Sequence, residues 1–218
     1  MRTKLLVVAM LAMFVGFTFN ADAQSMYAKK KAKEQKKEYK AKMKRYNKEG
    51  WQIFGSSHTL EVALLTHYEK MEKGDVVELT SNAMSTSKNI GKDKLIMSAC
   101  ASYAQLTSSS LKGRIVEDWG SRLTPDETNE FEQFYAAFEN NVKSEIRGEL
   151  RPSYSVYRPA TANGKQVYEF EAYYLIDEAA ALRARIRAFE NAAKESAIAQ
   201  KYAEQVSKFI SEGFSTEQ

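Results

Sequence analysis

The chain contains few of the residues that cross-link small folds or interrupt helices. Of its 218 residues, one is cysteine, three are proline and ten are glycine. The single thiol, Cys100, excludes an intrachain disulfide and a thiolate metal cluster. Because it lies among small residues of a predicted helix, we interpret it as a small buried hydrophobe. The scarcity of proline and glycine leaves long stretches uninterrupted, which favours a helix-rich fold.

Motifs of the common enzyme classes are also absent. The chain has no G-x-S-x-G, H-E-x-x-H, Walker or G-x-G-x-x-G pattern. His58 and His67 lie nine residues apart on one predicted helix, on opposite faces, so they cannot share a metal ion there. Glu169 and Glu171 share a face of a predicted strand, and we interpret this pair as a solvated strand edge. We therefore expect no catalytic residues, no metal and no cofactor, and predict that the protein is not an enzyme.

The first 23 residues have the pattern of a cleaved signal peptide. Arg2 and Lys4 precede a nearly unbroken apolar run over 5–19, and Ala21-Asp22-Ala23 supplies the small residues of a cleavage site. Fifteen apolar residues would span only about 22 Å as a helix, which is shorter than a ~30 Å hydrocarbon core. We expect cleavage between Ala23 and Gln24, followed by a periplasmic, outer-membrane-associated or secreted location.

Residues 24–50, called the arm below, are strongly basic. Over 29–49 there are eleven basic and three acidic residues, a net charge of +8, whereas the chain from Gly50 onward carries −5. Ala28, Ala32, Tyr39, Met43 and Tyr46 fall on one stripe of a predicted helix. The arm is expected to be helical or partly disordered. The residues predicted to bind a surface are Lys29, Lys30, Lys31, Lys33, Lys36, Lys37, Lys40, Lys44 and Arg45.

Two interpretations of the arm remain open at the level of the sequence. Runs of charge are commonly solvated faces, in which case the arm lies on the body or frays from it. Alternatively, the lysines capture an anionic surface such as phosphorylated lipid headgroups. Deep insertion is disfavoured, because the stripe offers two tyrosines and a methionine instead of leucine or tryptophan. Nucleic acid is not expected as a partner of an exported protein.

The remaining residues, 51–218, are predicted to form a single α+β domain. Periodicity and helix-end signals divide this part into elements. The expected order is a strand over 51–55, a helix over 57–74, a strand over 76–79, a polar loop over 81–92, and helices over 94–116 and 124–148. Thr124-Pro125-Asp126-Glu127 is a strong helix start, and the aromatic stripe after it is predicted to be core.

A hairpin over 153–177 is the clearest strand signal, with two β-rich runs around Asn163-Gly164. A long closing helix over 177–212 follows, of about 50 Å, which would overhang the body, bend or pack on the arm. The predicted fold class is α+β. It comprises a small antiparallel-containing sheet with a C-terminal hairpin, packed by several long helices, plus an N-terminal basic helical arm.

Three segments, 50–55, 99–106 and 167–177, carry a resemblance to known proteins. Together they resemble exported envelope proteins of the Bacteroidetes. More distantly they are similar to the small envelope-lipoprotein domain shared with the N-terminal part of flagellar assembly protein T. The resemblance covers Gly50 to about Ala192 and implies an α+β envelope domain with interaction roles and no catalytic residues. The chain departs from it by lacking a lipid-attachment cysteine and by carrying the basic arm.

These observations predict an exported, non-enzymatic envelope protein that binds a protein partner or an anionic envelope surface through the arm and the end of the C-terminal helix. Two alternatives stay open. One is a self-assembling structural component, a homo-oligomer in which the arm and the C-terminal helix pair between chains as a coiled coil. The other is an enzyme of unrecognised type acting on an envelope polymer, with Glu169 and Glu171 as its best residues.

Overall fold

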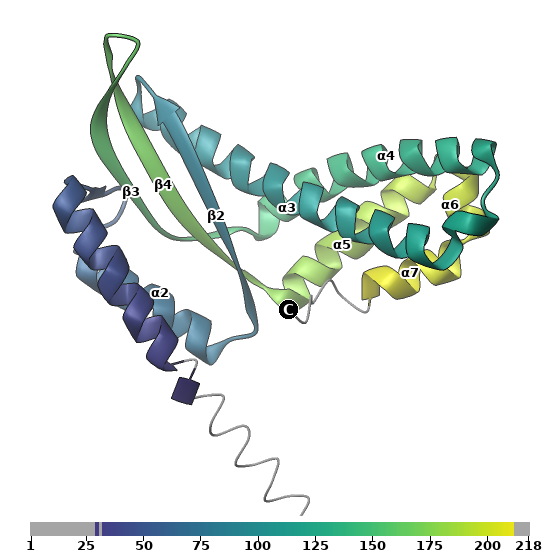
Figure 1. Cartoon of the computed structure of the whole chain (residues 1–218), viewed down its shortest axis with the longest axis horizontal. Coiled ribbons are helices and arrows are strands. Elements are labelled where there is room, and N and C mark those ends of the chain that lie inside the picture. Colours follow the sequence, from purple (N-terminus) through teal and green to yellow (C-terminus); the bar gives the residue numbers. More distant parts are fainter. Residues whose placement is uncertain (1–28, 31, 212–218) are drawn as a thin grey trace, which may run out of the picture. The chain divides into compact units, whose positions relative to one another are not determined.

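The computed structural model describes residues 29–30 and 32–211 (Figure 1). The chain divides into two compact units, residues 1–49 and residues 50–218, and each is described by itself. The predicted signal peptide and its cleavage site lie outside the described residues. In the first unit, residues 29–30 and 32–49 are helical.

The second unit is an α+β fold built on a four-stranded antiparallel sheet, which confirms the predicted fold class. Its strands are β1 (Gln52–Ile53), β2 (Val76–Ser85), β3 (Arg151–Ala162) and β4 (Lys165–Asp177), in the order β1-β3-β4-β2. The β3–β4 hairpin turns at Asn163 and Gly164, with φ of 52° and 72°. Such positive values are those of the type I′ turn that an Asn-Gly pair favours.

The helices of this unit lie on both faces of the sheet and beyond its end (Figure 1). Their bounds are α2 (Leu60–Lys73), α3 (Lys88–Trp119), the 3₁₀ turn η1 (Gly120–Arg122), α4 (Pro125–Glu149), α5 (Glu178–Ala193), α6 (Ala197–Lys201) and α7 (Ala203–Ser211). α3 packs against β2 and β4 with its first part and against α4 with its second, whereas α2 contacts β2 and β3.

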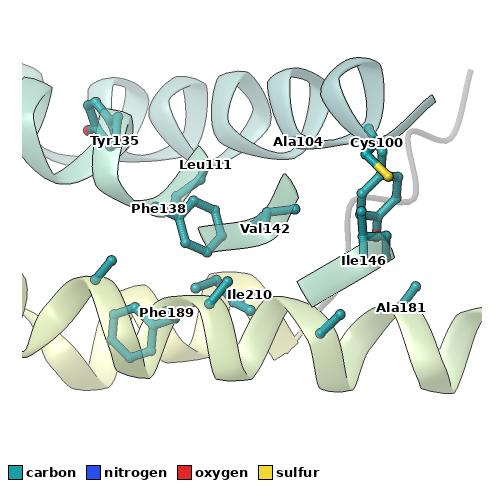
Figure 2. Close-up of a cluster of buried hydrophobic side chains, with 14 of the residues drawn as sticks. Cys100, Ala104, Leu111, Tyr135, Phe138, Val142, Ile146, Ala181, Phe189 and Ile210 are labelled. Carbon is teal, nitrogen blue, oxygen red and sulfur yellow. The ribbon is translucent and has the colours of Figure 1, made fainter. Parts of the chain in front are cut away.

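The main hydrophobic core joins the α3 side of the sheet to the packed helices. Phe170, Ala172, Tyr174 and Ile176, which alternate along β4 and so share one face of the strand, are buried in it. Figure 2 shows the helical part, where Leu111 of α3 lies near Phe138 and Val142 of α4 and faces α5. The aromatic stripe of α4 is buried here, as predicted, and its start at Thr124 forms a capping box with Glu127.

The prediction of a polar loop over 81–92 is wrong. β2 continues to Ser85, which pairs with Tyr168 of β4, and only two residues separate it from the start of α3 at Lys88. The serines, threonine and asparagine here suggested a loop because such side chains compete for backbone hydrogen bonds. A strand ladder is made by the backbone, however, and the long partner strand β4 supplies it along the whole of β2.

The prediction of a single long closing helix over 177–212 is also wrong. After Ala193 the chain breaks into α6 and α7, and α7 packs back on α3 and α5. The break has local causes: the Ser196 hydroxyl accepts from the backbone N–H of Ala199, and Gln200 Nε2 donates to the carbonyls of Ala193 and Lys194. These bonds satisfy groups that a helix end would otherwise leave unpaired.

Candidate functional site

The described part of the arm is a helix whose basic residues are mostly exposed. Nine of them, Lys29, Lys30, Lys33, Lys36, Lys37, Lys40, Lys44, Arg45 and Lys48, are exposed, and Lys42 is half-buried. Lys31, one of the predicted surface-binding residues, lies outside the described residues. Lys48, which the sequence analysis did not single out, belongs with the exposed set.

Eight lysines gather on one face of this helix. With successive residues turned by about 100°, Lys29, Lys30, Lys33, Lys36, Lys37, Lys40, Lys44 and Lys48 fall within an arc of about 120°. We call this set the lysine face. None of its members makes an ion pair with a described residue. Arg45, also predicted to bind a surface, lies outside the arc by about 60°.

The carboxylates of the arm stand outside the lysine face. Glu34, Glu38 and Glu49 fall between about 40° and 100° beyond its edge on the same helical wheel. Glu38 accepts from Lys42 Nζ at 3.0 Å, and the Arg45 guanidinium lies 4.7 Å from the centre of the Tyr46 ring. The two described cations outside the face therefore have partners within the arm, whereas the field of the lysine face is not neutralised locally.

The glutamate pair of the hairpin does not lie at a strand edge, which corrects the prediction. β4 is paired on both sides, with β2 and with β3, and is a central strand. Glu169 accepts from Arg158 Nε at 2.6 Å, and buried Glu171 accepts from the Tyr173 hydroxyl. Each carboxylate thus has its own partner on the sheet, and both border a shallow cavity of about 370 Å³ with Trp51 and Met84.

The structure brings together three side chains that sequence reasoning did not connect. His67 of α2 is fully buried; its Nδ1 lies 2.9 Å from Ser153 Oγ and its Nε2 lies 3.0 Å from Glu78 Oε2. The rings of Tyr68, Tyr154 and Tyr173 pack edge-on around the imidazole, with centroids 5.2–5.7 Å away. Ser153 stands 86 residues from His67 along the chain, so no local motif could have joined them.

Cys100 behaves as the sequence analysis predicted. Its side chain is buried in the main core, and burial raises the pKa of the thiol above its ordinary value, because the thiolate would be desolvated. A raised pKa leaves little of the reactive thiolate at neutral pH.

Within the described residues, no three His, Cys, Asp or Glu side chains are grouped so that they could hold a metal ion. Nor does any helix there combine the length and apolarity needed to cross a bilayer. Comparison of the chain with protein-family profiles, with curated proteins and with solved structures finds no match.

Proposed function

We propose that this protein is an exported docking protein that binds an anionic surface of the cell envelope through the lysine face of its arm. The observation that carries the proposal is the segregation of charge: eight exposed lysines on one helical face, with every carboxylate of the arm outside it. Docking of this kind is non-enzymatic, since it needs only a positively charged face that is accessible to the anionic surface.

Magnitudes favour a reversible, salt-sensitive attachment. A lysine held near an anionic membrane contributes about 1 kcal/mol, within a Debye length of about 8 Å at physiological ionic strength. Several lysines acting together would therefore give firm binding at low salt that weakens as salt rises. The body opposes this attraction, because the chain from Gly50 onward carries a net charge of −5. The arm would then be the part that touches the surface.

Export supports lipid phosphate over nucleic acid as the anionic partner. The pattern of the first 23 residues favours export from the cytoplasm. Nucleic acid is an abundant polyanion inside the cytoplasm but not outside it. Self-assembly through the arm and C-terminal helix is favoured less, because the closing helix breaks after Ala193 and folds back on α3 and α5.

The test is sedimentation of the chain, without its predicted signal peptide, with vesicles of phosphatidylglycerol and phosphatidylcholine or of phosphatidylcholine alone. We expect binding to the anionic vesicles only, falling steeply between 50 and 500 mM salt, about the range over which screening becomes strong. Deleting residues 27–48 should abolish it. Salt-insensitive binding, or a deletion variant that still sediments, would contradict the proposal.

A matched pair of variants separates the lysine face from net charge alone. K36Q/K40Q removes two charges from the face, and K42Q/R45Q removes two charges outside it. We expect the first to weaken binding roughly 30-fold, at about 1 kcal/mol per lysine, and the second much less. Equal losses would mean that the face has no role. A protein partner would be indicated by two results together: the chain does not bind vesicles, and protease treatment of envelope fractions abolishes its attachment to them.

A further inference from the structure

The buried His67 lies between a carboxylate and a serine hydroxyl, and the serine lines a cavity. This arrangement goes beyond the docking function of the arm. Ser153 Oγ lies 2.9 Å from one ring nitrogen and Glu78 Oε2 lies 3.0 Å from the other. A hydroxyl within reach of a base that a third group orients is the signature of an activated nucleophile.

The chemistry of the carboxylate decides how the imidazole is protonated. An ionised glutamate only accepts hydrogen bonds, so the Nε2 of a neutral His67 must carry the proton that it donates to Glu78. Nδ1 is then an acceptor, and the Ser153 O–H donates to it. The proton of the hydroxyl is therefore directed at a base whose tautomer is fixed, which is the condition for general-base activation.

The fold also places Ser153 where a substrate could reach it. The pairing of β3 with β4 shifts register between Pro152 and Tyr154, so Ser153 is the extra residue of a β-bulge. Bulges re-aim side chains and occur beside active sites. Ser153 is half-buried and lines a cavity of about 560 Å³ between α2 and the sheet.

The walls of this cavity indicate the class of compound that it would take. Val76, Pro152 and Leu175 provide apolar surface. The polar part of the wall consists of the Thr66 hydroxyl, the cations of Lys70 and Arg151, and the carboxylates of Glu69 and Asp177. Lys70 makes no ion pair with a described residue. Such a site suits a small carboxylic ester, its acyl group against the apolar wall and its carbonyl oxygen toward the ammonium group.

We propose that Ser153 is the nucleophile of an esterase site in which His67 is the general base and Glu78 positions the imidazole. Ser153 Oγ attacks the ester carbonyl, its proton passes to His67 Nδ1, and the bond to the leaving alcohol breaks as that proton is transferred to it. Water then attacks the acyl-serine, gives its proton to Nδ1, and the acid leaves as the proton returns to Oγ. The sum is ester plus water giving acid plus alcohol.

The experiment is labelling of the full chain with a fluorophosphonate probe, followed by mapping of the modified residue and by hydrolysis of p-nitrophenyl acetate and butyrate. We expect the label on Ser153 and loss of both labelling and hydrolysis in Ser153→Ala. Ser155→Ala, which removes a hydroxyl two residues along the same strand, is the matched control and should react like the parent chain. His67→Gln should lower the labelling rate at least 100-fold.

Glu78 is a positioning residue, so its test needs a readout that a structural role would not move. Glu78→Gln should lower the rate of ester hydrolysis and change the pH profile of that rate, whereas Glu78→Asp should retain part of the activity. Circular dichroism should show that both variants are folded. The inference is overturned if the probe labels no residue or a different one. It is also overturned if Ser153→Ala hydrolyses the esters as fast as the parent, or if labelling of Ser153 is unaffected by Glu78→Gln.

Discussion

At the scale of single residues, Gly91 fixes how closely α3 can approach the sheet. A Cβ atom at this position would stand 2.4 Å from Cε2 of the Phe170 ring, and Phe170 is fully buried. The ring cannot swing into solvent to make room, so the absence of a side chain at residue 91 is a packing requirement. Helix propensity alone would favour alanine there by about 1 kcal/mol.

Gly91→Ala should therefore destabilise the protein, by about 1–2 kcal/mol net, because overpacking costs more than the gain in helix propensity. Gly113→Ala is the control on the same helix, where a Cβ would meet nothing within 4 Å. It should stabilise by up to about 1 kcal/mol. Urea unfolding of both variants measures the difference. Equal free energies of unfolding for the two variants would show that the ring contact does not decide the position.

A second residue-scale prediction concerns Glu127, whose carboxylate lies 2.6 Å from Lys201 Nζ and caps the start of α4. Chiefly because of the hydrogen bond from Lys201, the pKa of Glu127 falls from its ordinary 4.5 to about 2. A lowered folded-state pKa contributes stability that is present above pH 4.5 and is lost as pH falls toward 2.

Thermal unfolding between pH 7 and pH 2 tests this link. Glu127→Gln should melt below the parent chain at pH 7, and the gap between the two melting temperatures should close as pH falls from about 4.5 toward 2. Glu130→Gln, a neighbouring glutamate for which no ion pair is described, is the control and should shift little. A gap that stays constant down to pH 2 would contradict the role of the Glu127 carboxylate.

At the scale of elements, the sequence predicts those whose signals are local. α4 was predicted over 124–148 and lies at Pro125–Glu149, because its cap and its apolar spacing are written in consecutive residues. The predicted strand over 76–79 is six residues shorter than β2, because the polar second half of β2 forms a strand only by pairing with the distant strand β4. The lysine face follows from composition and helical phase, whereas the His67–Ser153 contact depends on a bulge and on packing between distant segments.

The fold-back of α7 likewise depends on distant contacts, and it can be tested at Trp119. The Trp119 ring stacks on Tyr202 at 5.0 Å and lies 5.5 Å from Phe209, measured between ring centroids. Trp119→Ala should cost about 3 kcal/mol, and hydrogen exchange should quicken in α7. Trp119→Phe keeps a ring in place and should cost less. Unchanged exchange in α7 of the alanine variant would show that other contacts hold it.

At the scale of the whole second unit, Cys100 lies where the sheet and the packed helices share one core. Its side chain is 2% exposed, and it belongs to α3, the helix that contacts both the sheet and α4. The thiol should therefore react only when the shared core opens, and its raised pKa lowers the reactive fraction further. Alkylation in increasing urea should follow the unfolding curve measured by circular dichroism. If the thiol instead reacts well below the unfolding midpoint, the helices separate from the sheet before the core unfolds, and the unit is not one cooperative structure.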